Sequence, residues 1–168
     1  MKKVLIFDTS IMCVWLRVPG KDTCKSVDNT ITLESINKKI EEEKNNGTTF
    51  ILPIASIIET GNHIAHADGD KFNLGEKFAN LICDTANSNS PWAAFTEQSS
   101  LWKPENLVAL AKRWQKTVIT GQSLGDASIV EVAEYYASLG YEVEIYTGDK
   151  DLKAYQPIAK VQIPRRRR

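Results

Sequence analysis

Three short runs rich in apolar residues constrain the fold of this chain more than any other feature. They cover residues 4–7, 49–52 and 142–146, and the last is closed by Thr147-Gly148. Runs of this length bounded by turn-forming residues are typical of strands buried on both faces of a parallel sheet. A weaker fourth strand is predicted at residues 159–163.

Helical stretches separate these runs, so that strands and helices alternate along the chain. At residues 32–44, apolar side chains recur at helical spacing until Asn45-Asn46-Gly47 ends the pattern. Similar stretches lie at residues 55–67, 74–86, 105–116 and 127–139. This alternation predicts an α/β fold, with a parallel β-sheet flanked by helices on both faces.

No internal repeat or linker divides the chain, which predicts one domain over residues 1–164 followed by a basic tail, residues 165–168. Within the domain, residues 68–120 form an elaborated insert of helices and loops. Residues 87–100, rich in Asn, Ser and Thr, are predicted to be a loop that holds Trp92. The insert tryptophans could stack on RNA bases, but packing is the favoured interpretation.

Composition limits the classes of partner. The chain has 168 residues, of which 42% are hydrophobic and 25% charged, as in a soluble globular protein. Lys plus Arg and Asp plus Glu both number 21, so nucleic-acid binding would need a local basic patch or bound metal ions. Three cysteines without a CxxC pair favour reduced thiols in the cytoplasm. The first apolar run ends at Asp8, too early for a signal peptide or a membrane span.

Carboxylates follow the predicted strands where a ligand site is expected. Asp8 directly follows the first strand, and Asp149 lies three residues after the strand at 142–146. Because parallel strands end at the same edge of a sheet, these two side chains must share that edge. Glu59 lies about two turns into the helix after the second strand, and Asp126 begins the helix before the third.

The helix that begins at Asp126 supplies a second argument. Helical spacing aligns this residue with Ile129, Val130 and Ala133 on one apolar face. A carboxylate on such a face is costly to bury unless it is paired or binds a metal ion, so a shared cation is expected. The alternative is that Asp126 caps its helix and that all the acids are ordinary solvated residues.

Four segments of the chain occur in a characteristic order: IFDTS, the Glu of IIETGN, GDASIVEVA and YTGDKDL. In order and approximate spacing they resemble the PIN-domain nucleases, which include VapC-like toxins, over residues 4–163. The resemblance implies an acidic site formed by Asp8, Glu59, Asp126 and Asp149. It also implies a PIN-like three-layer sandwich fold.

The activity implied by the resemblance is Mg²⁺- or Mn²⁺-dependent endonucleolytic cleavage of single-stranded RNA. Divalent ions of this kind prefer oxygen ligands and can activate water for attack on a phosphodiester. Asp8, Asp126 and Asp149 are then the expected direct ligands, and Glu59 would hold a metal-bound water or a second ion. Smaller supporting roles fall to Thr9, Ser10, Thr147 and Asp151. The resemblance leaves open structured RNA as a substrate, a toxin or defence role, an antitoxin or other regulatory protein, and homodimerisation.

Other interpretations compete with the nuclease. A haloacid dehalogenase-like phosphatase also begins with a strand ending in Asp, but it needs a second acid two residues later, where this chain has Ser10. A catalytically silent PIN-like scaffold that binds RNA or protein would have the same motifs. His63 and His66 could form a metal site, although two solvated histidines are the simpler interpretation. Lys21, Lys25 and the basic tail are candidate phosphate contacts.

Overall fold

Three parallel strands form the central sheet of the computed structural model, which describes residues 2–26, 29–93, 95–155 and 157. They are β1 (Lys3–Phe7), β4 (Thr49–Ile51) and β5 (Glu142–Tyr146), in the order β4-β1-β5. In the sheet, Ile6 of β1 lies beside Ile51 and Ile145. The three predicted strands are therefore confirmed, while the predicted strand at 159–163 lies outside the described residues.

The five predicted helices are present, with ends that differ from the prediction by no more than three residues. They are α2 (Leu33–Asn45), α3 (Ile54–His66), α4 (Lys71–Ala86), α5 (Pro104–Thr117) and α6 (Leu124–Ser138). The sequence patterns missed two short helices, α1 (Thr9–Trp15) and α7 (Lys150–Ala154). Each begins close to a strand end, at a carboxylate that caps it: Asp8 caps α1 and Asp149 caps α7.

Two further differences concern the predicted loops. The prediction of a loop at residues 87–100 was wrong in its second half, because the 3-10 helix η1 (Phe95–Trp102) begins there. A second short 3-10 helix, η2 (Val118–Thr120), follows α5. Strands β2 (Thr23–Lys25) and β3 (Thr30–Thr32) form an antiparallel hairpin that the apolar pattern did not indicate.

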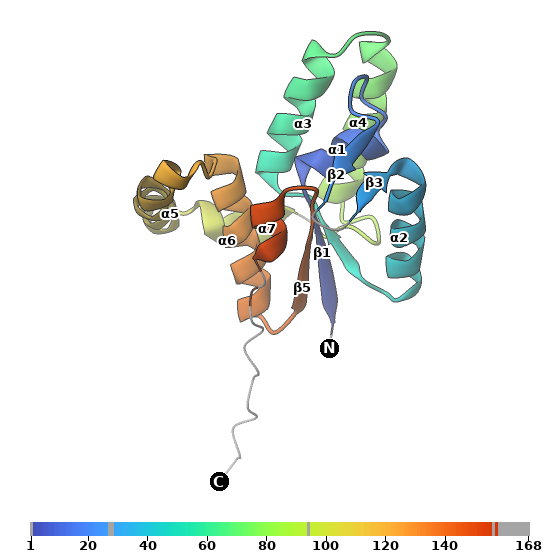
Figure 1. Cartoon of the computed structure of the whole chain (residues 1–168). Helices are drawn as coiled ribbons and strands as arrows, with labels where there is room; N and C mark the ends of the chain where they lie inside the picture. The colour runs from blue at the N-terminus through green and yellow to red at the C-terminus, as the bar shows by residue number, and fades with distance from the viewer. Residues whose placement is uncertain (1, 27–28, 94, 156, 158–168) are drawn as a thin grey trace.

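Helices cover both faces of the sheet, and Figure 1 shows α2 and α6 on opposite sides of it. The side chains of β1 alternate between the two layers. Leu5 and Phe7 pack with α1 to α4, whereas Val4 and Ile6 pack with α6. All four are fully buried. The fold is thus a three-layer α/β sandwich, as predicted, and the consecutive apolar run of β1 results from burial on both faces.

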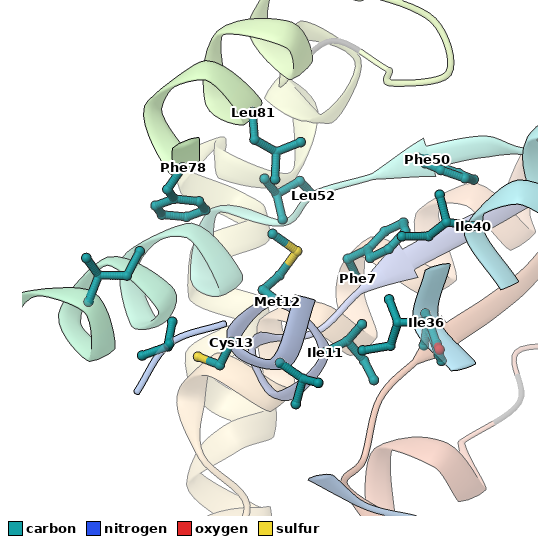
Figure 2. Close-up of a cluster of buried hydrophobic side chains, with 14 of the residues drawn as sticks. Phe7, Ile11, Met12, Cys13, Ile36, Ile40, Phe50, Leu52, Phe78 and Leu81 are labelled. Atoms are coloured by element: carbon teal, nitrogen blue, oxygen red, sulfur yellow. The ribbon is translucent and has the colours of Figure 1, made fainter. Parts of the chain in front are cut away.

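An aromatic cluster fills one of the two layers. The Phe7 ring lies 5.1 Å from Phe50 and 5.3 Å from Trp92, measured between ring centroids. Figure 2 shows the side chains of Phe7, Phe50 and Leu52 in this core. Leu52 directly follows β4, the strand that contains Phe50. Trp92 is buried and extends the sheet by one bridge beside Phe50. This tryptophan therefore has a packing role, as favoured from the sequence.

At the amino end of β1, a buried carboxylate is neutralised by lysines. Glu43 of α2 is 6% exposed, and Lys3 lies 2.5 Å from its Oε1 atom. The Thr48 hydroxyl donates to the other carboxylate oxygen at 2.6 Å, and Lys39 lies 3.6 Å away. Within the part of the chain that is described, no helix is long and apolar enough to cross a membrane.

Candidate active site

A cavity of about 350 Å³ opens at the carboxyl edge of the sheet. In Figure 1, the start of α1, helix α3 and the turn between β5 and α7 meet at this edge. All four predicted acids line the cavity: Asp8, Glu59, Asp126 and Asp149. The other lining residues are Thr9, Ser10, Cys13, Val14, Lys21, Thr23, Cys24 and His63. The four carboxylates come from four separate segments of the chain, so only the tertiary fold brings them together.

Asp8 is the most buried of the four carboxylates, with 6% of its surface exposed. It ends β1 and caps α1, and its backbone N–H donates to the carbonyl of Tyr146 at 3.1 Å. Its Oδ2 atom accepts hydrogen bonds from the hydroxyls of Ser10, at 2.8 Å, and Thr147, at 2.7 Å. Hydroxyl groups therefore hold one oxygen of Asp8 and leave the other for a ligand.

The two hydroxyl groups also connect β1 to the turn after β5. The Asp149 N–H donates to Thr147 Oγ1 at 2.8 Å, and the Gly148 N–H donates to Ser10 Oγ at 2.9 Å. Ser10 and Thr147 thus each accept a backbone N–H and donate to Asp8. These hydrogen bonds place both hydroxyls where they can orient the Asp8 carboxylate. A serine hydroxyl is not a carboxylic acid, so Ser10 does not supply the second acid that the phosphatase requires.

Glu59 approaches the site from α3. Its Oε2 atom accepts a hydrogen bond from the Thr9 hydroxyl at 3.0 Å. Its other oxygen lies against Gly125 at the start of α6. A β-carbon at Gly125 would collide with Glu59 Oε1 and lie 3.2 Å from the carboxyl carbon. The glycine before Asp126 therefore allows α6 to approach Glu59, which is a local reason for the Gly-Asp pair.

Asp126 departs from the expected burial. Ile129 and Ala133 on its helix face are buried, but Asp126 itself is only half-buried. It forms a capping box with Ser123, whose hydroxyl accepts from the Asp126 N–H at 2.9 Å. The expectation that this carboxylate is buried was thus wrong, because the residue lies at the helix end, where the apolar face stops. Ser123 is the N-cap of α6, and the Asp126 carboxylate accepts its backbone N–H at 3.3 Å and also lines the cavity.

Asp149 is exposed and caps α7. Its Oδ1 atom accepts the N–H groups of Asp151, at 2.8 Å, and Leu152, at 2.9 Å. Asp151 does not line the acidic cavity. It lines an adjoining cavity of about 410 Å³ that shares Asp126 and Asp149 with the first.

The donor set fits a hard divalent cation. None of the four carboxylates forms an ion pair with another described residue, in contrast to Glu43 with its lysine partners. A buried carboxylate such as Asp8 is costly without a counter-charge, and oxygen-rich clusters suit Mg²⁺ or Mn²⁺. Within the described ranges, however, no three His, Cys, Asp or Glu side chains are already gathered as around a bound ion.

Cys13 and Cys24 also line the cavity, although the sequence did not indicate them as site residues. Burial raises the pKa of Cys13 to about 11, and burial also raises the pKa of Cys24. A β-carbon at Gly148 would lie 2.9 Å from Cys24 Sγ and 3.0 Å from the Lys25 carbonyl. The glycine of the Thr-Gly-Asp turn is the sequence signal of this close hairpin contact.

The basic residues divide between the cavity and other surfaces. Lys21 and His63 are both exposed, and both line the acidic cavity. His66 instead bonds through Nδ1 to the Asn62 carbonyl at 2.8 Å and does not line the cavity. The two histidines therefore do not act together there. Residues 165–168 lie outside the described part of the chain.

A larger cavity of about 900 Å³ lies beside β5, between the hairpin and α2. Its lysines are already engaged. Lys39 lies 2.8 Å from Glu144, and Lys153 donates to Ser26 at 2.6 Å. Because none of the four predicted acids lines it, the smaller acidic cavity is the candidate site.

No protein-family model, no curated protein and no solved structure matches this chain.

Proposed function

We propose that this protein is a metal-dependent endoribonuclease of the PIN-domain type, which cleaves phosphodiester bonds of single-stranded RNA. The observation that supports this most is the meeting of Asp8, Glu59, Asp126 and Asp149 in one cavity. These are the positions that the motif resemblance implies, and they come from segments far apart in the sequence.

Each residue of the site has a task in this proposal. Asp8, Asp126 and Asp149 would hold Mg²⁺ or Mn²⁺, and Glu59 would orient the attacking water or hold a second ion. A bound ion lowers the pKa of an adjacent water and stabilises the charge that develops on the phosphate. Thr147 and the other hydroxyls around Asp8 hold that carboxylate in one orientation.

The substrate must reach an acidic site although the chain has no net charge. Lys21 and His63 offer positive or titratable groups at the same cavity. We propose that Lys21 contacts a phosphate of the RNA backbone, so that the metal ions and this lysine together offset the repulsion from the four acids.

A toxin role, with an antitoxin or another regulatory protein as partner, is a narrower proposal than the nuclease. Its test is growth arrest on expression of the chain, relieved by the substitution Asp8→Asn. A chain that cleaves RNA in vitro but does not arrest growth would contradict the toxin role and leave the nuclease proposal intact.

A catalytically silent scaffold that binds RNA or protein is the second candidate. The scaffold predicts RNA binding without cleavage in the presence of Mg²⁺ or Mn²⁺, whereas the nuclease predicts cleavage that EDTA abolishes.

The deciding experiment is cleavage of single-stranded RNA in Mn²⁺ by the full chain and three variants. Asp8→Asn and Asp126→Asn keep the side-chain shape but remove charge, and each is expected to lower the rate on the order of a hundred-fold or more. Glu41→Gln is the matched control, since Glu41 is an exposed acid of α2 outside the site. Cleavage that survives both aspartate substitutions would refute the proposed site.

A further inference from the structure

A second cavity adjoins the acidic one and shares the side chains of Asp126 and Asp149 with it. It has a volume of about 410 Å³, within the range of small-molecule sites. Its remaining lining residues come from the end of α5, the loop after it, α6 and α7: Thr117, Thr120, Gly121, Gln122, Val130, Asp151, Leu152 and Tyr155.

One wall of this cavity is a loop whose backbone is held in place by hydrogen bonds. The Trp114 indole N–H donates to the Gln122 carbonyl at 3.0 Å, and the Thr120 hydroxyl donates to the Thr117 carbonyl at 2.7 Å. Gly121 adopts a left-handed conformation, with φ of 90°, that closes the turn. The Gln122 side chain is half-buried and makes no hydrogen bond with another described residue. Its amide is therefore a free donor and acceptor on a rigid wall.

A second part of the cavity lining is an aromatic ring. Tyr155 is half-buried and packs against the core layer that contains Leu152. Its hydroxyl donates to the carboxylate of Glu134, and burial raises the pKa of this phenol well above its usual range. The packing against this layer and the hydrogen bond to Glu134 hold the ring with its hydroxyl directed towards α6. Val130 and Leu152 add apolar surface beside it.

The charge of the cavity selects the kind of group that it can bind. Asp126, Asp149 and Asp151 line it, and its described lining residues include no lysine or arginine. A phosphate is therefore disfavoured here, whereas the acidic cavity next to it has Lys21. A neutral planar group with hydrogen-bonding edges suits a fixed ring, an apolar wall and a free amide.

We propose that this cavity binds one nucleobase of the RNA, stacked on Tyr155 and recognised at its edge by Gln122. This inference rests on the proposed ribonuclease function. Since Asp126 and Asp149 separate the two cavities, the bound nucleotide lies directly next to the bond that is cleaved. Gln122 is then a specificity-determining residue, because an amide can form paired hydrogen bonds with some base edges and not with others.

The test measures binding of the four nucleoside 5′-monophosphates to the full chain in Mg²⁺. The readout is the change in the NMR signals of Tyr155 and Gln122. Ribose 5-phosphate, which has no base, is the matched ligand control. We expect the nucleotides to shift both signals, with a preference among the four, and ribose 5-phosphate to leave them unchanged. Equal shifts by ribose 5-phosphate, or no base-dependent shift up to about 10 mM, would overturn the inference.

Three substitutions at two positions separate the role of the ring from that of the amide. Tyr155→Leu is expected to raise the Kd on the order of ten-fold, because stacking is lost, whereas Tyr155→Phe keeps the ring and most of the binding. Gln122→Leu lies on a surface loop and is expected to equalise the four nucleotides. If Tyr155→Leu does not fold, Gln122→Leu alone still decides, and an unchanged preference in it contradicts the assignment.

These measurements involve no bond cleavage, so they can fail independently of the proposed function. The ribonuclease proposal fails when the wild-type chain does not cut RNA with any divalent ion. Failure of this inference is a wild-type chain that cuts RNA while Gln122→Leu cuts the same sequences at the same rates.

Discussion

Replacing Gly125 by alanine tests whether Glu59 is held against the start of α6. Helix propensity alone predicts that Gly125→Ala stabilises the chain by about 0.5–1 kcal/mol. The structure predicts the opposite sign. The added β-carbon would collide with Glu59 Oε1, so the carboxylate must shift, and we expect it to lose the 3.0 Å hydrogen bond from Thr9 to its other oxygen.

The magnitude follows from that bond. A hydrogen bond to a charged group contributes about 1.5–3 kcal/mol, and the half-buried position of Glu59 favours the lower end. Subtracting the propensity gain leaves a net loss of about 1 kcal/mol for Gly125→Ala. In a Glu59→Ala background the carboxylate is absent, and the same substitution should stabilise by about 0.5–1 kcal/mol.

A double-mutant cycle measured by urea unfolding compares the four chains. The expected coupling between positions 59 and 125 is about 1.5–2 kcal/mol, with a reversal of sign between the two backgrounds. If Gly125→Ala is equally stabilising in both backgrounds, the contact between α6 and Glu59 does not exist in solution. The measurement does not depend on nuclease activity.

Three further predictions concern the acids and their supports. Thr147→Val removes the hydroxyl between Asp8 and Asp149, and should lower the free energy of unfolding by about 2–3 kcal/mol in urea titrations. A loss below about 0.5 kcal/mol would contradict the hydroxyl bridge. Mg²⁺ should raise the Tm of the wild-type chain, because binding at a hundred times the Kd stabilises the folded state by about 2.7 kcal/mol. The rise in Tm should be smaller in Asp8→Asn. Burial opposes ionisation of Glu43, but the hydrogen bonds from Lys3 and Thr48 and the charges of Lys3 and Lys39 outweigh this effect. The pKa of Glu43 is therefore lowered. The stability from this pair is therefore complete above the ordinary value of 4.5 and is lost as pH falls through the lower folded value. Accordingly, Glu43→Gln should cost roughly 3 kcal/mol at pH 7 and clearly less at pH 3; an equal cost at both would exclude the charge as its cause.

The strands could be predicted because their signal is local. A central strand such as β1 must be apolar on both faces, and its consecutive run Val4-Leu5-Ile6-Phe7 cannot serve another element of that length equally well. From the strands alone it followed that Asp8 and Asp149 share one edge. The five longer helices were recognisable for a similar reason, since each has an apolar face that must be buried.

Short elements left no such pattern. Helix α7 has five residues, too few to form alone in water, and it is stabilised by Asp149 and by packing of Leu152. Helix α1 depends in the same way on its cap at Asp8. The hairpin β2–β3 has mostly exposed, polar-rich strands, and only Cys24 and Ile31 pack against the core.

For the candidate site, sequence by itself determined which residue types lie at strand ends and in which order they occur. Tertiary structure decided that Glu59 and Asp126 meet, because α3 and α6 are far apart in the chain and only packing brings them together. It also decided that Asp126 is half-buried at a helix end, which periodicity could not show, since a helical repeat gives the direction of a side chain but not where the neighbouring layer stops. The adjoining cavity beside Tyr155 likewise exists only because α5, α6 and α7 meet there.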